Sequence, residues 1–423
     1  MLEFEKSLKD NDIVINVDKV AWEQIAEEQL STCSISDKNI KEKIIIELGK
    51  QLYEEFKKKK GKAHVVNQIS FEKRKKAIRD KLDVNESLVS FHGEGSNANI
   101  DYFYSKDLDV RIISSVQDAI NLLDSKTLDF NPLEINQSGV KYFFRGHEQD
   151  SFKCIPSVLR NKNYFENEDE LYIELQTLSP RNFANKSKHL EILTEMQHYS
   201  LPTRLLDITT NPLAALFFSV FSTDPISYFF DGEVIVLKTE KNSIKNFSSD
   251  IIELQTSLAF LSKEKKARIK EQAVKYKSST IKDGRITKFN ENDCVKQLIH
   301  EASKSGILFQ NEIDPKHLFE IYLCLPLKNN ERISSQSGAF LSYGFLNSRK
   351  NENDFYNKSE EDYLRKLKGL FYNSSKGKVR FIIPFQLKEE ILAKLDDLGI
   401  NQGNIYPDIE KRSGYIKGKY LSI

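Results

Sequence analysis

Residues 197–212 read Gln-His-Tyr-Ser-Leu-Pro-Thr-Arg-Leu-Leu-Asp-Ile-Thr-Thr-Asn-Pro. This stretch places many hydrogen-bonding side chains between two apolar helical patterns, one over 188–199 and one that begins at Pro212. Polar groups between buried helices must find partners or face a cleft, so we expect a functional loop here. Arg204 and Asp207 lie three residues apart and could instead form a buried ion pair that fixes the loop.

Strand and helix patterns alternate on both sides of this loop. Runs of β-branched and aromatic residues predict strands near residues 142, 234, 322, 339 and 381. Apolar periodicity predicts a further helix over 387–398, and Gly399 follows it at the position where helix ends favour glycine. Together these elements predict an α+β fold in which helices surround a central mixed sheet.

The pattern of charged and apolar residues changes near residue 109. Residues 1–108 alternate charged runs with helical periodicity, which predicts an N-terminal, mainly helical region. Residues 109–423 form the main domain, with charged insertions expected at about 245–318 and 347–377. The lysine-rich run Lys57–Lys62 is either a solvated helix face or a contact with phosphate or a protein partner.

Composition excludes several classes of protein. The 423 residues contain 63 Lys and Arg against 62 Asp and Glu, a net charge of +1, so any anion binding must come from a local patch. Four widely spaced Cys argue against a disulfide scaffold and a Cys-based zinc site. The apolar run Leu213–Phe221 falls short of the roughly twenty residues that span a membrane, so we expect no membrane contact and a cytoplasmic protein.

Several motifs resemble one bacterial family. Tyr142-Phe143-Phe144-Arg145-Gly146-His147 looks like the Phe-Arg-Gly motif that names the FRG domain family. The resemblance continues through Pro156-Ser157-Val158-Leu159-Arg160 and from Gln197 to Leu216, except that Ser200 stands where the family usually has glycine. Residues 332–340 and 399–408 resemble later family segments, so the match covers roughly 110–240 and 320–423.

The resemblance implies a function. FRG proteins are bacterial and phage-associated, which suggests a defence or toxin-type effector with an anion- or nucleotide-binding cleft. A remote similarity to ADP-ribosyltransferases implies NAD as cofactor, with Arg145 as the phosphate contact and Gly146 allowing close approach. Those enzymes also need a Glu, for which Glu233, Glu320 and Glu331 are candidates.

The candidate site combines this resemblance with residue chemistry. We expect catalytic groups at His198, Asp207 and Gln336, and ligand contacts from Arg145, Gly146, Gln197, Thr203, Arg204, Asn211 and Arg332. No metal is expected, since no His-Glu-x-x-His pattern occurs.

Two other functions compete with the enzyme hypothesis, a non-catalytic binding module and a defence nuclease. The first is a non-catalytic FRG module that recognises nucleic acid or a protein, for which a shallow basic groove reaching Lys57–Lys62 is expected. The enzyme hypothesis predicts instead a deep pocket with a carboxylate facing it. A defence nuclease is disfavoured, because no carboxylate cluster has metal-site spacing.

Overall fold

The structure is a computed structural model of the full chain, and the parts described begin in the first strand and end in the last helix. The described residues are 5–9, 12–16, 101–105, 108–121, 139–223, 230–277, 284–309, 313–328, 331–346, 355–374 and 377–421. Most of the expected helical region over 1–108, including Lys57–Lys62, lies outside them. Its described parts are strands: β1 (Glu5–Lys9), β2 (Asp12–Asn16) and β3 (Asp101–Ser105).

The central feature of the fold is a ten-stranded mixed sheet. Its order is β3-β4-β12-β7-β5-β6-β10-β9-β8, with β11 paired to β12. Two pairs, β4 with β12 and β8 with β9, are parallel, and the other pairs are antiparallel. The strands are β4 (Leu108–Ile112), β5 (Val140–His147), β6 (Leu206–Thr209), β7 (Gly232–Glu240), β8 (Lys245–Asn246), β9 (Ile321–Leu325), β10 (Gly338–Tyr343), β11 (Asn373–Ser374) and β12 (Gly377–Ile383).

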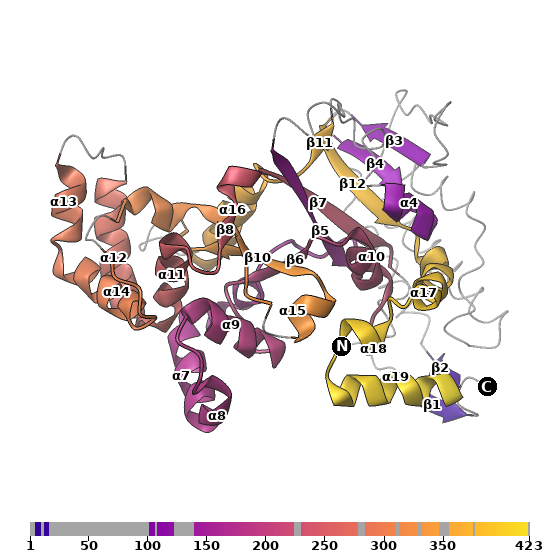
Figure 1. Cartoon of the computed structure of the whole chain (residues 1–423). Helices are drawn as coiled ribbons and strands as arrows, with labels where there is room; N and C mark the ends of the chain where they lie inside the picture. Colours follow the sequence, from indigo (N-terminus) through magenta and orange to yellow (C-terminus); the bar gives the residue numbers. More distant parts are fainter. Residues whose placement is uncertain are drawn as a thin grey trace.

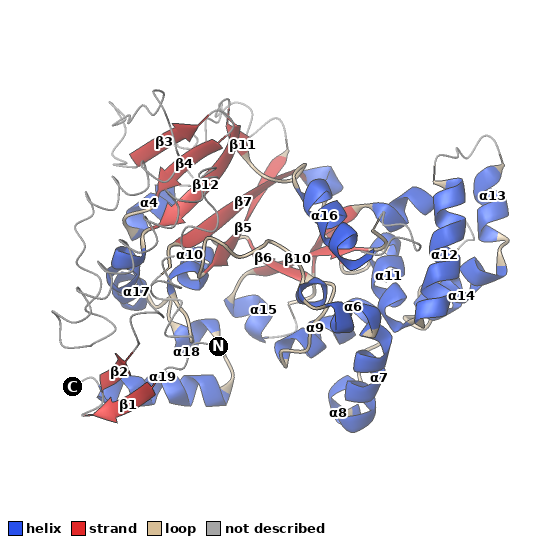
Figure 2. Ribbon diagram, turned by 180° about the vertical axis from the view of Figure 1, so that it is seen from behind, coloured by secondary structure: helices blue, strands red, loops and turns tan. Residues whose placement is uncertain are grey.

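Helices cover both faces of this sheet, which confirms the α+β prediction (Figures 1 and 2). On one face α10 packs against β5 and β7, and its neighbours α4 and α17 complete that core. On the other face the 3₁₀ turn η2 (Ser157–Arg160) and α16 bury a second core. The helices concerned are α4 (Val116–Asn121), α10 (Pro212–Val220), α16 (Phe355–Leu367) and α17 (Lys388–Asp397).

The five strands expected from sequence are all present, but one central strand was missed. Residues 206–209, expected within a loop, form β6 between β5 and β10. Its four residues are too few to show a convincing alternation in sequence. The strand expected near residue 339 is β10, which starts at Gly338, and the short helix α15 (Glu331–Ser335) precedes it.

The insertion expected at about 245–318 forms a helical lobe beside the sheet, visible at the left of Figure 1. It contains α11 (Asp250–Ser257), α12 (Lys263–Tyr276), α13 (Arg285–Asn290) and α14 (Asp293–Ser303), followed by η7 (Pro315–Phe319). These helices bury a core of their own around Leu258, Phe289 and Leu298. The lobe is therefore a packed unit, although α12 is so rich in Lys and Glu that only Ile269 and Ala273 are buried on it.

A second helical group supports the loop at 199–205. It comprises α6 (Lys162–Glu166), α7 (Glu168–Leu178), α8 (Pro180–Phe183) and α9 (His189–His198). The chain ends in α18 (Gln402–Ile405) and α19 (Ile409–Leu421), which lie below α17 in Figure 1.

Helix α9 ends in a Schellman motif that delivers the chain into the functional loop. The Ser200 amide donates to the Gln197 carbonyl, and the Leu201 amide donates to the Met196 carbonyl. Ser200 adopts a φ of 65°, the left-handed conformation that this motif requires. Helix α17 ends in the same way, with Gly399 at a φ of 75°. Glycine adopts this left-handed conformation without strain, whereas Ser200 carries a Cβ.

Candidate functional site

The Phe-Arg-Gly motif occupies the last half of β5, and each of its residues has a separate task. Phe144 is buried in the core beneath α10. Arg145 is half-buried and lines a cavity. Gly146 lies so close to α10 that a Cβ there would stand 1.9 Å from the Ala215 carbonyl oxygen. Its small size therefore serves helix packing, and Gly146 also belongs to the lining of the cavity.

The cavity next to the motif has a volume of about 380 Å³. Its walls come from β5, the end of α9, β6, α15 and the segment that follows α18. The polar side chains that line it include Arg145, Arg160, Gln197, Asp207, Arg332 and Gln336. Segments far apart in sequence therefore converge on one cavity.

Arg145 is held at the cavity by two hydrogen bonds. Its Nε donates to Nε2 of His147 at 3.0 Å, and its Nη1 donates to the backbone oxygen of Asp207 at 2.5 Å. Nη2 forms no hydrogen bond with any described residue. The guanidinium is thus oriented from one side and keeps donors for a ligand, the arrangement that suits phosphate.

A chain of hydrogen bonds orients the carboxylate of Asp207. Thr203 Oγ1 donates to Gln197 Oε1 at 2.6 Å, and Gln197 Nε2 donates to Asp207 Oδ2 at 2.5 Å. Thr203 is fully buried and lies behind the cavity wall, so it supports Gln197. Both Gln197 and Asp207 line the cavity itself.

Arg204 does not join the site, which corrects its expected role as a ligand contact. Its Nε and Nη2 donate to the two carboxylate oxygens of Glu168 at 2.9 and 2.5 Å, and Nη1 donates to backbone carbonyls of Gln255 and Tyr343. The side chain is 4% exposed and lies outside the cavity lining. The buried bidentate pair considered from the sequence is present, with Glu168 as partner in place of Asp207.

Asn211 also has a structural role. Its side chain caps α10 by accepting a hydrogen bond from the Leu213 amide at 2.9 Å, and it lies outside the cavity lining. Asn-Pro is a strong helix-start signal for this reason, and the helix begins at Pro212 as expected.

The C-terminal segment closes one side of the cavity. Tyr406 lines it, and the Arg332 guanidinium lies 5.4 Å from the centre of the Tyr406 ring. Gln336 Nε2 donates to the Ile405 carbonyl at 3.1 Å, so Gln336 ties α15 to this segment. Arg332 Nη1 donates to the His198 carbonyl at 3.2 Å.

His198 pairs with a carboxylate from the same segment. Its Nε2 lies 2.9 Å from Asp408 Oδ1, while Nδ1 is buried and has no hydrogen-bond partner among the described residues. A carboxylate on Nε2 favours the tautomer protonated there, which leaves the lone pair on Nδ1. This geometry fixes the orientation of the His198 ring, and its partner Asp408 was not foreseen.

Two arginines, Arg145 and Arg160, give part of the cavity lining a positive charge. Burial, followed by the charge of Arg145, holds the pKa of His147 well below its ordinary value, so this imidazole is neutral and accepts from Arg145. The pKa of Arg160 is lowered by partial desolvation and by Arg145, although much of its side chain is exposed. Arg160 belongs to the Pro156–Arg160 motif but was not expected in the site, and the structure places it in the cavity lining with Arg145.

The carboxylates expected from sequence are elsewhere. Glu331 is exposed on α15, and Glu233 is buried in an ion pair with Arg380 at 2.7 Å. Neither Glu233, Glu320 nor Glu331 belongs to the lining, whereas Glu148 does. Glu148 follows the Phe-Arg-Gly-His motif directly, and that position in the sequence was the signal that could have found it.

Fold and site together define an α+β domain with an arginine-rich cavity beside the Phe-Arg-Gly strand end. Residues 140–226 match the FRG domain family, so the chain carries an FRG domain. Comparisons with curated proteins and with solved structures gave no match.

Membrane spans and metal clusters are both absent from the described residues. No helix in the described parts is long and apolar enough to cross a membrane. In those same parts, no group of three or more His, Cys, Asp and Glu is arranged to hold a metal ion.

Proposed function

We propose that this FRG domain binds a nucleotide in the cavity, with NAD as the leading ligand. The observation that carries the proposal is the convergence of Arg145, Arg160 and Arg332 on one hollow. Three guanidinium groups in one cavity attract an anionic ligand, and a diphosphate offers the oxygens that match their planar forks. The proposed phosphate site is not a patch on one element, because its three arginines come from β5, η2 and α15.

The cavity also contains negatively charged side chains, which supports binding of a ribose beside the phosphates. Asp207 and Glu148 are carboxylates in the lining, and carboxylates accept hydrogen bonds from sugar hydroxyls. Asp207 is oriented by Gln197, so its position is fixed before a ligand arrives. We assign ribose contacts to these two residues and phosphate contacts to the three arginines.

ADP-ribosyl transfer is the reaction this arrangement supports best. In that reaction the bond between ribose C1′ and nicotinamide breaks, nicotinamide leaves, and an acceptor nucleophile bonds to C1′ while losing a proton. A carboxylate near C1′ stabilises the cationic sugar of the transition state, a role that Glu148 or Asp207 can fill. The proton can pass to the other of these two carboxylates, because Nδ1 of His198 is buried and its Nε2 faces Asp408. The bacterial setting implied by the FRG family makes a defence or toxin-type effector the biological context.

The direct test is thermal stabilisation by ligand. At a concentration one hundred times its dissociation constant, NAD or ADP-ribose should stabilise the wild type by about 2.7 kcal/mol. Arg145→Ala should lose most of this shift, whereas Arg181→Ala, an exposed arginine of α8 outside the cavity, should keep it. No shift with either nucleotide at millimolar concentration would reject the nucleotide proposal.

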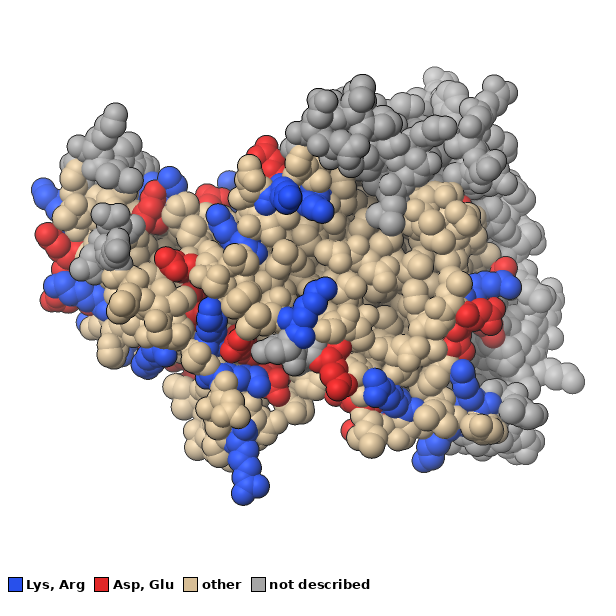
Figure 3. All heavy atoms as spheres, in the orientation of Figure 1, with Lys and Arg blue, Asp and Glu red and all other residues tan. Residues whose placement is uncertain are grey.

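The alternative proposal is a non-catalytic module that recognises nucleic acid or a protein. Its expected groove involves Lys57–Lys62, which lies outside the described residues. On the face shown in Figure 3, basic and acidic side chains of the described residues are interspersed. Those residues therefore form no large, purely basic patch on this face, which is the kind of surface that binds nucleic acid. We therefore prefer a nucleotide as the ligand over nucleic acid.

A further inference from the structure

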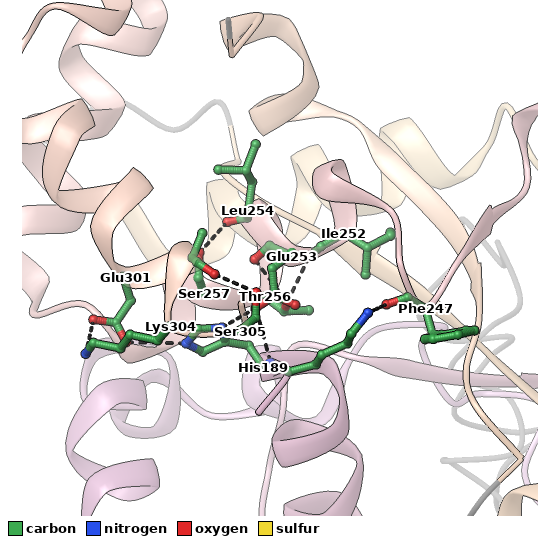
Figure 4. A network of polar contacts seen from close by, with 12 residues as sticks. His189, Phe247, Ile252, Glu253, Leu254, Thr256, Ser257, Glu301, Lys304 and Ser305 are labelled. Carbon is green, nitrogen blue, oxygen red and sulfur yellow. Dashed lines mark hydrogen bonds and ion pairs between the residues drawn. The ribbon is translucent and has the colours of Figure 1, made fainter. Parts of the chain in front are cut away.

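A buried histidine joins three helices outside the cavity. His189 opens α9 and is 3% exposed. Its Nδ1 lies 2.5 Å from Glu253 Oε1 on α11, and its Nε2 lies 3.3 Å from Glu301 Oε1 on α14. Figure 4 shows the ring between the two carboxylates. One side chain thus connects α9 to two helices of the lobe formed by α11 to α14.

The geometry defines the protonation state of this ring. A carboxylate accepts hydrogen bonds, so a ring nitrogen beside an ionised carboxylate must carry a proton. Both nitrogens of His189 face carboxylates, which requires the doubly protonated imidazolium. Burial lowers the pKa of His189, but the hydrogen bonds to Glu253 and Glu301 outweigh it and raise the pKa above its ordinary value.

The charged groups that face His189 show which contact depends on its charge. Glu253 is 1% exposed and also accepts from the His189 amide, and its Oε2 has no partner among the described residues. Glu301 is more open and has a second cation, because Lys304 Nζ lies 2.6 Å from its Oε2. The ring of Phe260 packs 4.8 Å from the imidazole and carries no charge. The neighbouring Lys188 is directed away, to the Phe247 carbonyl and ring.

Loss of one proton therefore has a defined consequence. The shorter contact to Glu253 keeps the proton on Nδ1, because that carboxylate is almost fully buried. Nε2 then presents a lone pair to the Glu301 carboxylate, so the attraction between His189 and Glu301 is replaced by repulsion. Glu301 can turn toward solvent with Lys304, so the last turn of α14 loses its link to α9.

We propose that His189 is a pH-dependent latch that fastens α14 of the helical lobe to α9. The latch is closed while the imidazolium persists and opens as the pH rises through the pKa of His189. Helix α9 continues directly from this latch to Gln197 and His198 at the cavity, so an altered lobe position reaches the site through one helix. The latch itself stands whether or not the cavity binds a nucleotide.

Hydrogen–deuterium exchange on the full chain tests the latch. After correction for intrinsic exchange, protection of α14 amides in the wild type should fall by up to about tenfold per pH unit between the ordinary pKa, which His189 has in the open state, and its raised pKa in the closed state. Over that range one proton is released on opening, and at higher pH the protection should level off. Amides of β5 and β7 report the rest of the fold and should not follow this slope.

Two variants provide the comparison. His189→Gln cannot become cationic, so α14 should exchange faster at low pH and show no such pH slope. His300→Gln, an exposed histidine on the same helix, should behave as the wild type does. The same pH slope in His189→Gln and wild type would overturn the proposal.

A second measurement keeps the proposal testable if His189→Gln fails to fold. Nitrogen-15 spectra of the wild-type histidine rings at neutral pH should show one doubly protonated ring, with a pKa above that of a free histidine. If every histidine ring in the wild type is neutral at pH 7, the latch does not exist.

Discussion

At the scale of single residues, Arg145 is the residue on which the site depends. Its two anchoring bonds, to the neutral His147 and to the Asp207 carbonyl, leave one side of the guanidinium for a ligand. Arg145→Lys keeps the charge but loses the planar fork. We expect at least tenfold weaker binding of ADP-ribose, measured by calorimetry, with a melting temperature within a few degrees of the wild type. A large fall in melting temperature with unchanged affinity would make Arg145 a structural residue.

Ser200 offers a second prediction at this scale. Its left-handed backbone strains any residue that carries a Cβ. Ser200→Gly should relieve this strain and raise the free energy of unfolding by about 1 kcal/mol, measured by denaturant titration.

Ser200→Ala is the matched control for that measurement. It keeps the strained backbone and removes only an exposed hydroxyl, so its stability should stay within about 0.5 kcal/mol of the wild type. Equal stability of the glycine and alanine variants would contradict the strain argument.

At the scale of elements, the approach of α10 to β5 explains why the motif ends in glycine. Gly146→Ala would place a Cβ against the Ala215 carbonyl and within 2.9 Å of Phe218 Cβ. Helix and strand must then separate, so we expect a loss of about 3 kcal/mol or more in the free energy of unfolding, measured by denaturant titration.

Gly414→Ala provides the control for Gly146→Ala. Gly414 lies in α19, and no described atom lies within 4 Å of the place that an alanine methyl group would take. Alanine should therefore be tolerated there and gain up to about 1 kcal/mol of helix propensity. A well-folded Gly146→Ala protein with unchanged stability would show that α10 packs less closely than described.

Elements with strong local signals were predictable, and those defined by distant partners were not. Helix α10 followed from Asn211-Pro212, and the end of α17 followed from Gly399, because caps act within one turn. Strand β6 was missed because its identity comes from pairing with β5 and β10. For the site, the order of motifs gave Arg145, Gln197, Asp207, His198, Arg332 and Gln336, which line one cavity. The partner of Arg204 could not be foreseen, since Glu168 lies 36 residues away with no motif around it.

At the scale of the whole molecule, buried charge gives the stability a second dependence on pH. Lys388 is 1% exposed, and its Nζ donates to the Glu148 carbonyl beside the cavity. Burial lowers its pKa to about 8 from an ordinary 10.5. Between these values the unfolded chain binds more protons than the folded one, so this residue makes stability rise as pH increases.

Lys388→Met tests this contribution. The variant should lack the part of the rise between about pH 8 and pH 10.5 that Lys388 causes, measured as the free energy of unfolding against pH. Lys394→Met, an exposed lysine on the same helix, should retain it. This dependence has the opposite sign to that of the His189 latch, so the two can be separated.

The most direct test of the central claim is calorimetric titration of ADP-ribose into the full-length protein. ADP-ribose carries the diphosphate and ribose groups that the cavity is proposed to hold, and it needs no acceptor to bind. We predict saturable binding at one site per chain, weakened at least tenfold by Arg145→Ala and unchanged by Arg181→Ala. Absence of binding, or equal binding by wild type and Arg145→Ala, would contradict the assignment of this cavity as a nucleotide site.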